Sequence, residues 1–313
     1  MAYEIIFLFA FSFAFINARV IEMSQIYLNG EYLPLDQAKI SVLDRGFLFA
    51  DGVYEVIPAY GGRMLRVQEH LQRLQNSLDA IRLENPLSNS QWLNVFEKIL
   101  TDNPNQGAGE DKSIYLQVTR GVAAVRNHGF PEEINQTVFM MVNELPPVNK
   151  EKLRAGVAAI TLDDIRWKAC NVKSISLLGN ILLRQQAHDN NAAEAILIND
   201  GLVTEGAASN VFAVINNVLV TAPAGTQLLP GITRDLIVEL AAEHNIPCEE
   251  RGFSEAELLS ASEIWFSSST KEILPVVELN GKPVANGKSG PIWEKMIDIY
   301  QACKAKLRSG ESS

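Results

Sequence analysis

The sequence predicts a protein of mixed α and β structure, α/β or α+β, with two domains. The chain has 313 residues, a length that fits two domains of about 100–200 residues each. Segments with the alternation of a β-strand and segments with the apolar spacing of a helix follow one another along it. A proline-containing segment at residues 145–150 separates a first group of such elements from a second group.

The composition is that of a folded, soluble protein. Apolar residues make up 47% of the chain and charged residues 20%, which excludes an intrinsically disordered chain. The formal net charge of −10 argues against nucleic acid or a membrane as a partner. The three cysteines are far apart, so we expect neither a disulfide framework nor a zinc ribbon, and no metal site. This cysteine usage fits a reducing compartment, and we expect a cytoplasmic protein.

Residues 1–22 do not resemble the rest of the chain. Residues 5–16 form an almost unbroken apolar run, shorter than the roughly 20 residues that a membrane span needs. The residues before this run contain no Lys or Arg, which a secretory signal would have. Three alternatives are open: translation begins at Met23, the segment is a secretory signal, or it is a genuine N-terminal helix. We favour the first and treat residues 1–22 as an atypical extension.

The smaller, N-terminal domain is expected at residues 23–144. It opens with a hairpin at residues 26–33, because Asn29-Gly30 between alternating apolar residues is a strong hairpin signal. A second hairpin is expected at Gly61-Gly62. Helical spacing of apolar residues predicts a helix over residues 68–83. The other elements expected are strands at 53–60, 113–120 and 137–144, a helix at 91–100 and a polar loop at 103–111.

Residues 145–150 form the predicted interdomain linker, because their two prolines cannot continue a strand and stiffen the crossing. The larger domain is expected at residues 151–308, followed by a flexible tail at 309–313. Neither GxGxxG nor GxxxxGKS/T is present, so a Rossmann or P-loop nucleotide site is not indicated. The elements expected are strands at 155–162, 195–198, 210–215, 218–221 and 263–267, and helices at 176–189, 233–244 and 291–307.

Two residues of the second half could take part in chemistry. Lys173 stands at the end of an extended stretch, just before a helix predicted to begin near Ser176. Loss of water at such a junction lowers the pKa of a lysine and frees a nucleophilic amine. Glu205 precedes small residues and an apolar strand, where its carboxylate could pair with a protonated ring nitrogen. Taken singly, each residue also fits an ordinary surface or turn position.

Three further segments suggest anion binding. The helix expected after Leu229-Pro-Gly231 would offer the free N–H groups of Gly231, Ile232 and Thr233 to a phosphate. The hydroxyl run at residues 267–270 could join that site. Arg126 and His128, two residues apart in a predicted loop, could grip a carboxylate together. Each segment alone also fits an ordinary helix start, a polar turn or a surface loop.

The joint order of these pieces resembles the class IV, or fold-type IV, pyridoxal-phosphate aminotransferases, above all those that act on D-amino acids. The resemblance runs from about Gln25 to about Lys306. It implies a smaller N-terminal α/β domain and a larger, β-barrel-like C-terminal domain with helices. The matching segments are DRGFLFADGVYEV (44–56), EHLQRL (69–74), YLQVTRG (115–121), RNHGFP (126–131), DIRWKACNVKSISLLGN (164–180), TEGAASNVF (204–212), LLPGITRD (228–235) and SSSTKEILPV (267–276).

The resemblance implies a role for each matching residue. Lys173 matches the lysine that forms the Schiff base with pyridoxal 5'-phosphate and shuttles the substrate proton. Glu205 matches the carboxylate that keeps the pyridine nitrogen protonated, which makes the ring an electron sink. The remaining cofactor contacts implied are Arg73, Ile232, Thr233 and Ser269 at the phosphate and Leu229 against the ring.

For the substrate, the resemblance implies that Tyr54, Arg126 and His128 hold the α-carboxylate. Arg126 and His128 would come from the other subunit of a homodimer, so a monomer should be inactive. One departure is visible: the relatives carry further serines after Thr204-Glu-Gly, whereas this chain has Ala207 and Ala208. Because two hydroxyls near the substrate are missing, we expect an altered substrate preference.

The expected reaction is D-alanine plus 2-oxoglutarate to pyruvate plus D-glutamate, in a ping-pong cycle through the Lys173 Schiff base. Four alternatives are open. Three are other activities of the same fold: an L-branched-chain aminotransferase, an aminodeoxychorismate lyase and an (R)-selective amine transaminase. None of these is expected to carry the Arg126 and His128 trap. The fourth is a non-catalytic homologue, which the presence of Lys173, Glu205 and Arg73 disfavours.

Overall fold

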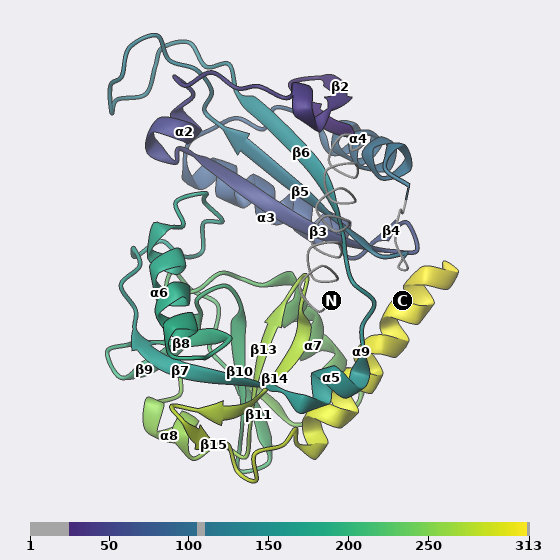
Figure 1. Ribbon diagram of the computed structural model, residues 1–313, viewed down its shortest axis with the longest axis vertical. Helices are drawn as coiled ribbons and strands as arrows, with labels where there is room; N and C mark the ends of the chain where they lie inside the picture. Colours follow the sequence, from purple (N-terminus) through teal and green to yellow (C-terminus); the bar gives the residue numbers. More distant parts are fainter. Residues whose placement is uncertain (1–24, 105–109, 312–313) are drawn as a thin grey trace, which may run out of the picture.

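The computed structural model describes residues 25–104 and 110–311 (Figure 1). Two β-sheets, one in each half of the chain, lie one above the other in this view. The mixed α and β structure predicted from the sequence is confirmed. The extension expected at residues 1–22 lies outside the described residues, as do residues 105–109 of the predicted polar loop.

The first sheet is antiparallel throughout. Its strands are β1 (Gln25–Leu28), β2 (Glu31–Pro34), β3 (Gly52–Tyr60), β4 (Arg63–Met64), β5 (Lys112–Thr119) and β6 (Thr137–Glu144). They lie side by side in the order β2-β1-β6-β5-β3-β4. The turn between β1 and β2 has φ of 51° at Asn29 and 96° at Gly30. Because such a two-residue turn needs positive φ at both positions, Asn29-Gly30 specifies this hairpin, and the prediction is confirmed.

One face of the first sheet is covered by two helices, α3 (Val67–Ala80) and α4 (Asn89–Asp102). Leu71, Leu74 and Leu78 of α3 are buried with Trp92 and Phe96 of α4 in a single apolar cluster. The spacing that predicted both helices therefore marks their buried sides. Two shorter elements, η1 (Leu35–Gln37) and α2 (Arg45–Phe49), precede β3.

The boundaries of three predicted elements differ from the structure. Helix α3 ends at Ala80 and not at residue 83, because Arg82 takes a φ of 53° that interrupts the helix. The predicted linker includes the first residue of a helix, α5 (Lys150–Ala155), that was not expected. The Asn149 side chain accepts a hydrogen bond of 3.0 Å from the Lys152 N–H and caps this helix. The residues 309–311 of the predicted tail continue the last helix and its cap.

The second sheet is mixed and curled. Its strands are β7 (Val157–Asp163), β8 (Glu194–Asn199), β9 (Leu202–Gly206), β10 (Asn210–Ile215), β11 (Val218–Thr221), β12 (Cys248–Glu250), β13 (Glu263–Ser268), β14 (Glu272–Leu279) and β15 (Lys282–Pro283). The order is β12-β11-β10-β13-β14-β7-β8-β9, and β15 pairs with β14. The pairs β11/β12, β14/β7 and β7/β8 are parallel, and the other pairs are antiparallel.

The helices of this half are α6 (Leu178–Asp189), α7 (Ile232–Glu243), α8 (Glu255–Leu259) and α9 (Pro291–Ser309). Helices α7 and α9 pack on the sheet through Ile237 and Trp293, which are buried with Trp265. Helix α9 runs alongside the second half and its end reaches the edge of the first (Figure 1), where Arg308 forms an ion pair with Asp111. It therefore fixes one sheet relative to the other. No helix in the described part of the chain is long and apolar enough to cross a membrane.

Candidate active site

A cavity of about 280 Å³ brings the predicted site residues together. This volume is close to the lower end of the range typical of small-molecule sites. The first half of the chain contributes Tyr54 from β3 and Arg73 from α3, and the second half contributes the rest of the wall. Eight of the ten site residues predicted from the sequence line it: Tyr54, Arg73, Lys173, Glu205, Leu229, Ile232, Thr233 and Ser269.

Lys173 is held at the junction of the two halves by its backbone. Its N–H donates to the Ser77 hydroxyl of α3 at 3.1 Å, and its carbonyl accepts from the Tyr54 N–H of β3 at 2.9 Å. The Lys173 Nζ lies over the Tyr54 ring, 4.0 Å from the ring centroid. Among the described residues the amine makes no ion pair, and the aromatic ring is its electrostatic partner. The lysine is thus fixed by its backbone while its amine is open to the cavity.

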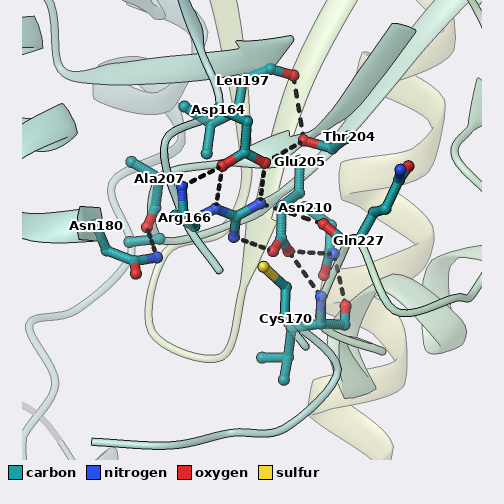
Figure 2. Close-up of polar contacts among 12 residues, drawn as sticks. Asp164, Arg166, Cys170, Asn180, Leu197, Thr204, Glu205, Ala207, Asn210 and Gln227 are labelled. Atoms are coloured by element: carbon teal, nitrogen blue, oxygen red, sulfur yellow. Dashed lines mark hydrogen bonds and ion pairs between the residues drawn. The ribbon is translucent and has the colours of Figure 1, made fainter. Parts of the chain in front are cut away.

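Glu205 also lines the cavity, from β9, and lies inside a network of donors (Figure 2). One carboxylate oxygen accepts from Arg166 Nη1. The other accepts from the Leu229 N–H at 3.1 Å and the Asn210 amide at 3.2 Å. Burial raises the pKa of Glu205 to about 7, although the Arg166 guanidinium and the Leu229 N–H act against the rise. The carboxyl group can therefore exchange a proton near neutral pH.

Arg166 is fixed in turn by Asp164. Its Nε and Nη2 donate to the two oxygens of Asp164 at 2.9 Å and 2.7 Å, a two-bond pairing that sets the plane of the guanidinium. The Thr204 hydroxyl donates to Asp164 at 3.2 Å. Sequence reasoning did not single out Asp164, Arg166 or Asn210. The only available signal was their place inside the two segments that also hold Lys173 and Glu205.

The N-terminus of α7 forms a cradle suited to a phosphate. Gly231 precedes the helix, and no side chain caps the free N–H groups of its first turn, where Ile232 and Thr233 line the cavity. A Cβ at Gly231 would lie 1.9 Å from Asn210 Oδ1, so only glycine fits there. Ser267 also lines the cavity, and its buried hydroxyl has no hydrogen-bond partner among the described residues. A bound anion would satisfy both the helix end and this hydroxyl.

Arg73 reaches this cradle from α3 and is held by a buried carboxylate. Its Nε and Nη2 each donate to Glu55 at 2.8 Å, and its Nη1 donates to the Pro230 carbonyl at 2.9 Å. His70 Nδ1 lies 2.7 Å from the same carboxylate. Burial alone would raise the pKa of Glu55, but the Arg73 guanidinium and His70 hold it well below its usual range. The positive charge of Arg73 is therefore held in a fixed position beside the N-terminus of α7.

Arg126 and His128 do not line the cavity of their own chain. Both lie in the exposed loop between β5 and β6. The Arg126 guanidinium lies 4.9 Å from the centroid of the Phe49 ring, and the His128 ring lies 5.2 Å from it. The loop is fixed by Arg45, whose Nη1 donates to the Asn127 carbonyl at 2.6 Å. Within the described chain, these two side chains are exposed and do not line the cavity that contains Lys173.

The chain is similar to proteins of known family. The family model for amino-transferase class IV matches residues 52–279. A D-alanine aminotransferase of Staphylococcus epidermidis is 39% identical over 89% of this chain and 97% of that protein. A branched-chain amino acid aminotransferase of Escherichia coli has a similar structure, with a TM-score of 0.80 at 25% identity over 90% of this chain and 94% of that chain. A hypothetical aminotransferase of Mycobacterium tuberculosis in a PLP-bound form has a TM-score of 0.77 at 26% identity, over 89% and 98% of the two chains.

Proposed function

The chain belongs to the class IV aminotransferases, and from this premise we propose that it transfers the amino group of D-amino acids to 2-oxo acids. The proposed pair of substrates is D-alanine and 2-oxoglutarate, with pyruvate and D-glutamate as products. The similarity to a D-alanine aminotransferase at 39% identity over nearly all of that protein supports this choice. The observation that carries the proposal is the cavity itself, which a lysine amine, a buried carboxyl group and an uncapped helix N-terminus line together.

The cofactor is pyridoxal 5'-phosphate, and the residues of the cavity fit it. When bound, it supplies an aldehyde that accepts the amino group and a ring that withdraws electrons from the substrate Cα. The unpartnered Ser267 hydroxyl, the α7 N-terminus and Arg73 supply the hydrogen-bond donors and the positive charge that a phosphate would need. Ser269, Ile232 and Thr233 complete this wall, and Leu229 lies beside Glu205 where the ring would pack.

Three groups of the chain have a task in the proposed reaction. The Lys173 amine would hold the cofactor and would act as the base that takes the proton from the substrate Cα. Glu205 keeps a proton at the ring nitrogen, and a pKa raised by burial to about 7 suits that exchange. Arg166 fixes the Glu205 carboxylate so that the ring has one orientation. Because the Lys173 amine would carry the proton, its position would determine which face of the substrate Cα receives it.

We infer that Tyr54 binds the substrate α-carboxylate together with Arg126 and His128 of a second copy of the chain. The two latter residues lie outside the cavity of their own chain, which supports a role across a homodimer interface. Large apolar side chains are exposed beside the loop, with Phe47 at 69% and Val125 at 74% exposure. Others are exposed in the cavity wall, among them Trp167 and Ile181. Exposed apolar surface of this extent is typical of a subunit interface.

We propose a smaller domain at residues 23–144 and a larger one at 151–308, because each of these ranges contains one of the two sheets. We also propose a cytoplasmic enzyme. Cys170, Cys248 and Cys303 are free thiols, which supports a reducing compartment.

A second candidate is transamination of branched-chain L-amino acids, which the structural similarity to branched-chain aminotransferases supports. The Arg126 and His128 pair favours the first candidate, because a guanidinium and an imidazole two residues apart suit an α-carboxylate. The lyase and the (R)-amine transaminase have no such observation in their favour.

One experiment separates these candidates. The protein loaded with pyridoxal phosphate is given D-alanine and 2-oxoglutarate, and pyruvate is followed with a coupled dehydrogenase. A parallel reaction contains L-leucine and 2-oxoglutarate. We expect pyruvate that depends on 2-oxoglutarate, no turnover of L-leucine, and loss of activity in Lys173→Ala but not in Lys168→Ala, a matched exposed lysine of the same segment. Turnover of L-leucine without activity on D-alanine would overturn the proposal.

A further inference from the structure

We propose that Arg184 of α6 selects substrates with an acidic side chain by binding their second carboxylate. The substrate class that follows is the D-amino acids with a side-chain carboxylate, such as D-glutamate, and the corresponding 2-oxo dicarboxylic acids. This inference rests on the proposed function and adds the residue that reads the side chain.

The first step is the position of α6 beside the cavity. Leu177, Asn180, Ile181 and Arg184 all line it. Because residues three, four and seven positions apart share one side of a helix, a single stripe of α6 faces the ligand. The Asn180 amide donates to the Ala207 carbonyl at 2.8 Å (Figure 2), which fixes this stripe against the turn after β9. None of these residues belongs to the groups proposed to hold the cofactor, so the stripe is available to the substrate.

The second step is the balance of charge in the cavity wall. Its cationic side chains are Arg73, Arg166, Lys173 and Arg184. Arg73 is already paired with Glu55, and Arg166 is already paired with Asp164 and Glu205. Lys173 lies against an aromatic ring and is committed to the cofactor. Within the described cavity wall, Arg184 is therefore the guanidinium without an acidic partner.

The third step is what a dicarboxylic substrate needs. Its α-carboxylate is proposed to bind Tyr54, Arg126 and His128, which leaves the second carboxylate to be desolvated at the cavity. A carboxylate without a partner is costly to remove from water, whereas a guanidinium binds it through two parallel hydrogen bonds. Leu177 and Ile181, on the same stripe, offer apolar surface to the methylene groups between the two carboxylates. A small substrate such as D-alanine needs none of these contacts.

The test compares substrates that differ in their side chain, so it does not depend on overall activity. In Arg184→Leu, we expect kcat/KM for D-glutamate and for 2-oxoglutarate to fall at least about tenfold, and kcat/KM for D-alanine to change less than about twofold. Arg184→Lys keeps the positive charge and should retain most of the activity on D-glutamate. Lys168→Gln removes a nearby exposed positive charge outside the cavity wall and serves as the matched control.

A binding measurement supplies a readout that does not depend on turnover. Glutarate has two carboxylates and no amino group, and its affinity for the wild-type holoenzyme is measured by calorimetry against that of butyrate, which has one. Arg184→Leu should lower the affinity for glutarate about tenfold and change the affinity for butyrate less than about twofold. Thermal melting and circular dichroism verify that each variant is folded.

The two proposals fail in different ways. A wild-type protein without activity on D-alanine and 2-oxoglutarate overturns the proposed function. If the wild-type protein has that activity, the role of Arg184 alone is overturned when Arg184→Leu lowers kcat/KM for D-glutamate and for D-alanine equally. It is also overturned when Arg184→Leu changes neither value. An equal fall in kcat/KM for D-glutamate in Lys168→Gln also overturns the role of Arg184. The fall would then come from the overall electrostatic field of the protein and not from a specific contact.

Discussion

The Lys173 amine lies over the ring of Tyr54, with Nζ 4.0 Å from the ring centroid, and the Tyr54 N–H donates to the Lys173 carbonyl at 2.9 Å. The two residues are thus joined through both backbone and side chain, although β3 and the Lys173 segment belong to different halves of the chain. The Tyr54 ring is stacked on Tyr115, with centroids 5.8 Å apart, which fixes its plane. Tyr54 therefore positions the amine as well as carrying the hydroxyl proposed to meet the substrate.

Two substitutions separate these tasks of Tyr54. Tyr54→Phe keeps the ring over Lys173 and removes the hydroxyl, so we expect KM for D-alanine to rise about tenfold with kcat little changed. Tyr54→Leu also removes the ring, so both constants should worsen. In the cofactor-free protein, acylation of Lys173 by a lysine reagent, followed by mass spectrometry, should be faster in Tyr54→Leu and unchanged in Tyr54→Phe. Equal acylation rates in all three proteins would contradict a positioning role for the ring.

Glu205 should give the cofactor-free protein a stability that falls as pH rises. Burial raises its pKa from 4.5 to about 7, so between these values the folded protein holds a proton that the unfolded chain has released. The folded state then loses stability with rising pH across that window, by about 3 kcal/mol at most. Glu205→Gln removes this loss, and urea titrations at pH 5 and pH 8 measure it. Glu97→Gln, at an exposed position of α4, is the control, and the same slope in Glu205→Gln as in wild type would refute the assignment.

Local signals explain what could be predicted from the sequence. The hairpin at Asn29-Gly30 follows from two residues that tolerate positive φ, and α3 follows from leucines on one side of a helix. Strand β14 was not expected because Pro275 lies inside it. Strand β9 was not expected because Thr204-Glu-Gly206 has the composition of a turn.

The candidate site also combines residues that local sequence signals predict with residues that only tertiary contacts reveal. Lys173 and Glu205 were predicted as site residues because both stand in segments whose order is characteristic of one family, and their roles stay predictions. Their partners were missed, because Arg166 lies 39 positions from Glu205 and no periodicity links the two. Arg73 was predicted as a phosphate contact, but its pairing with Glu55 was not, because that pairing depends on how α3 packs on β3, which is a tertiary contact.

Glu55→Gln should weaken both the fold and the phosphate site. The substitution leaves the buried Arg73 without its counter-charge, which costs about 3–5 kcal/mol of the free energy of unfolding. Since the pKa of Glu55 is held well below its usual range, this contribution is present above about pH 4.5 and is lost only in strong acid. Affinity for pyridoxal phosphate should fall more than affinity for pyridoxal, measured by titration of the cofactor absorbance. Glu69→Gln removes an exposed pairing with Arg66 and should lower the free energy of unfolding by less than about 1 kcal/mol. A similar loss of stability in both variants would argue against a stabilising buried ion pair.

The alanines after Glu205 should influence which substrates are preferred. Ala207 and Ala208 line the cavity, and Ala207 is held by the Asn180 amide. Serines at these positions would add two hydroxyls to the wall that the substrate meets. We expect Ala207→Ser with Ala208→Ser to change the ratio of kcat/KM between D-alanine and D-glutamate about threefold or more, with the fold retained. An unchanged ratio and an unchanged rate on D-alanine would remove the basis for this expectation.

The proposed contribution of Arg126 across a dimer interface predicts complementation between two inactive variants. Lys173→Ala lacks the amine in its own cavity, and Arg126→Ala would lack the carboxylate contact in its partner's cavity. When the two are unfolded together and refolded in equal amounts, half of the dimers should be mixed, and each mixed dimer holds one site with both residues intact. Activity should then return to about a quarter of the wild-type value, since one site in four is complete. If Arg126 served the cavity of its own chain, every site of the mixed dimer would lack one residue and no activity would return. The two variants refolded separately and then combined without exchange of subunits are the control, and activity in that mixture would mean that one variant alone is active.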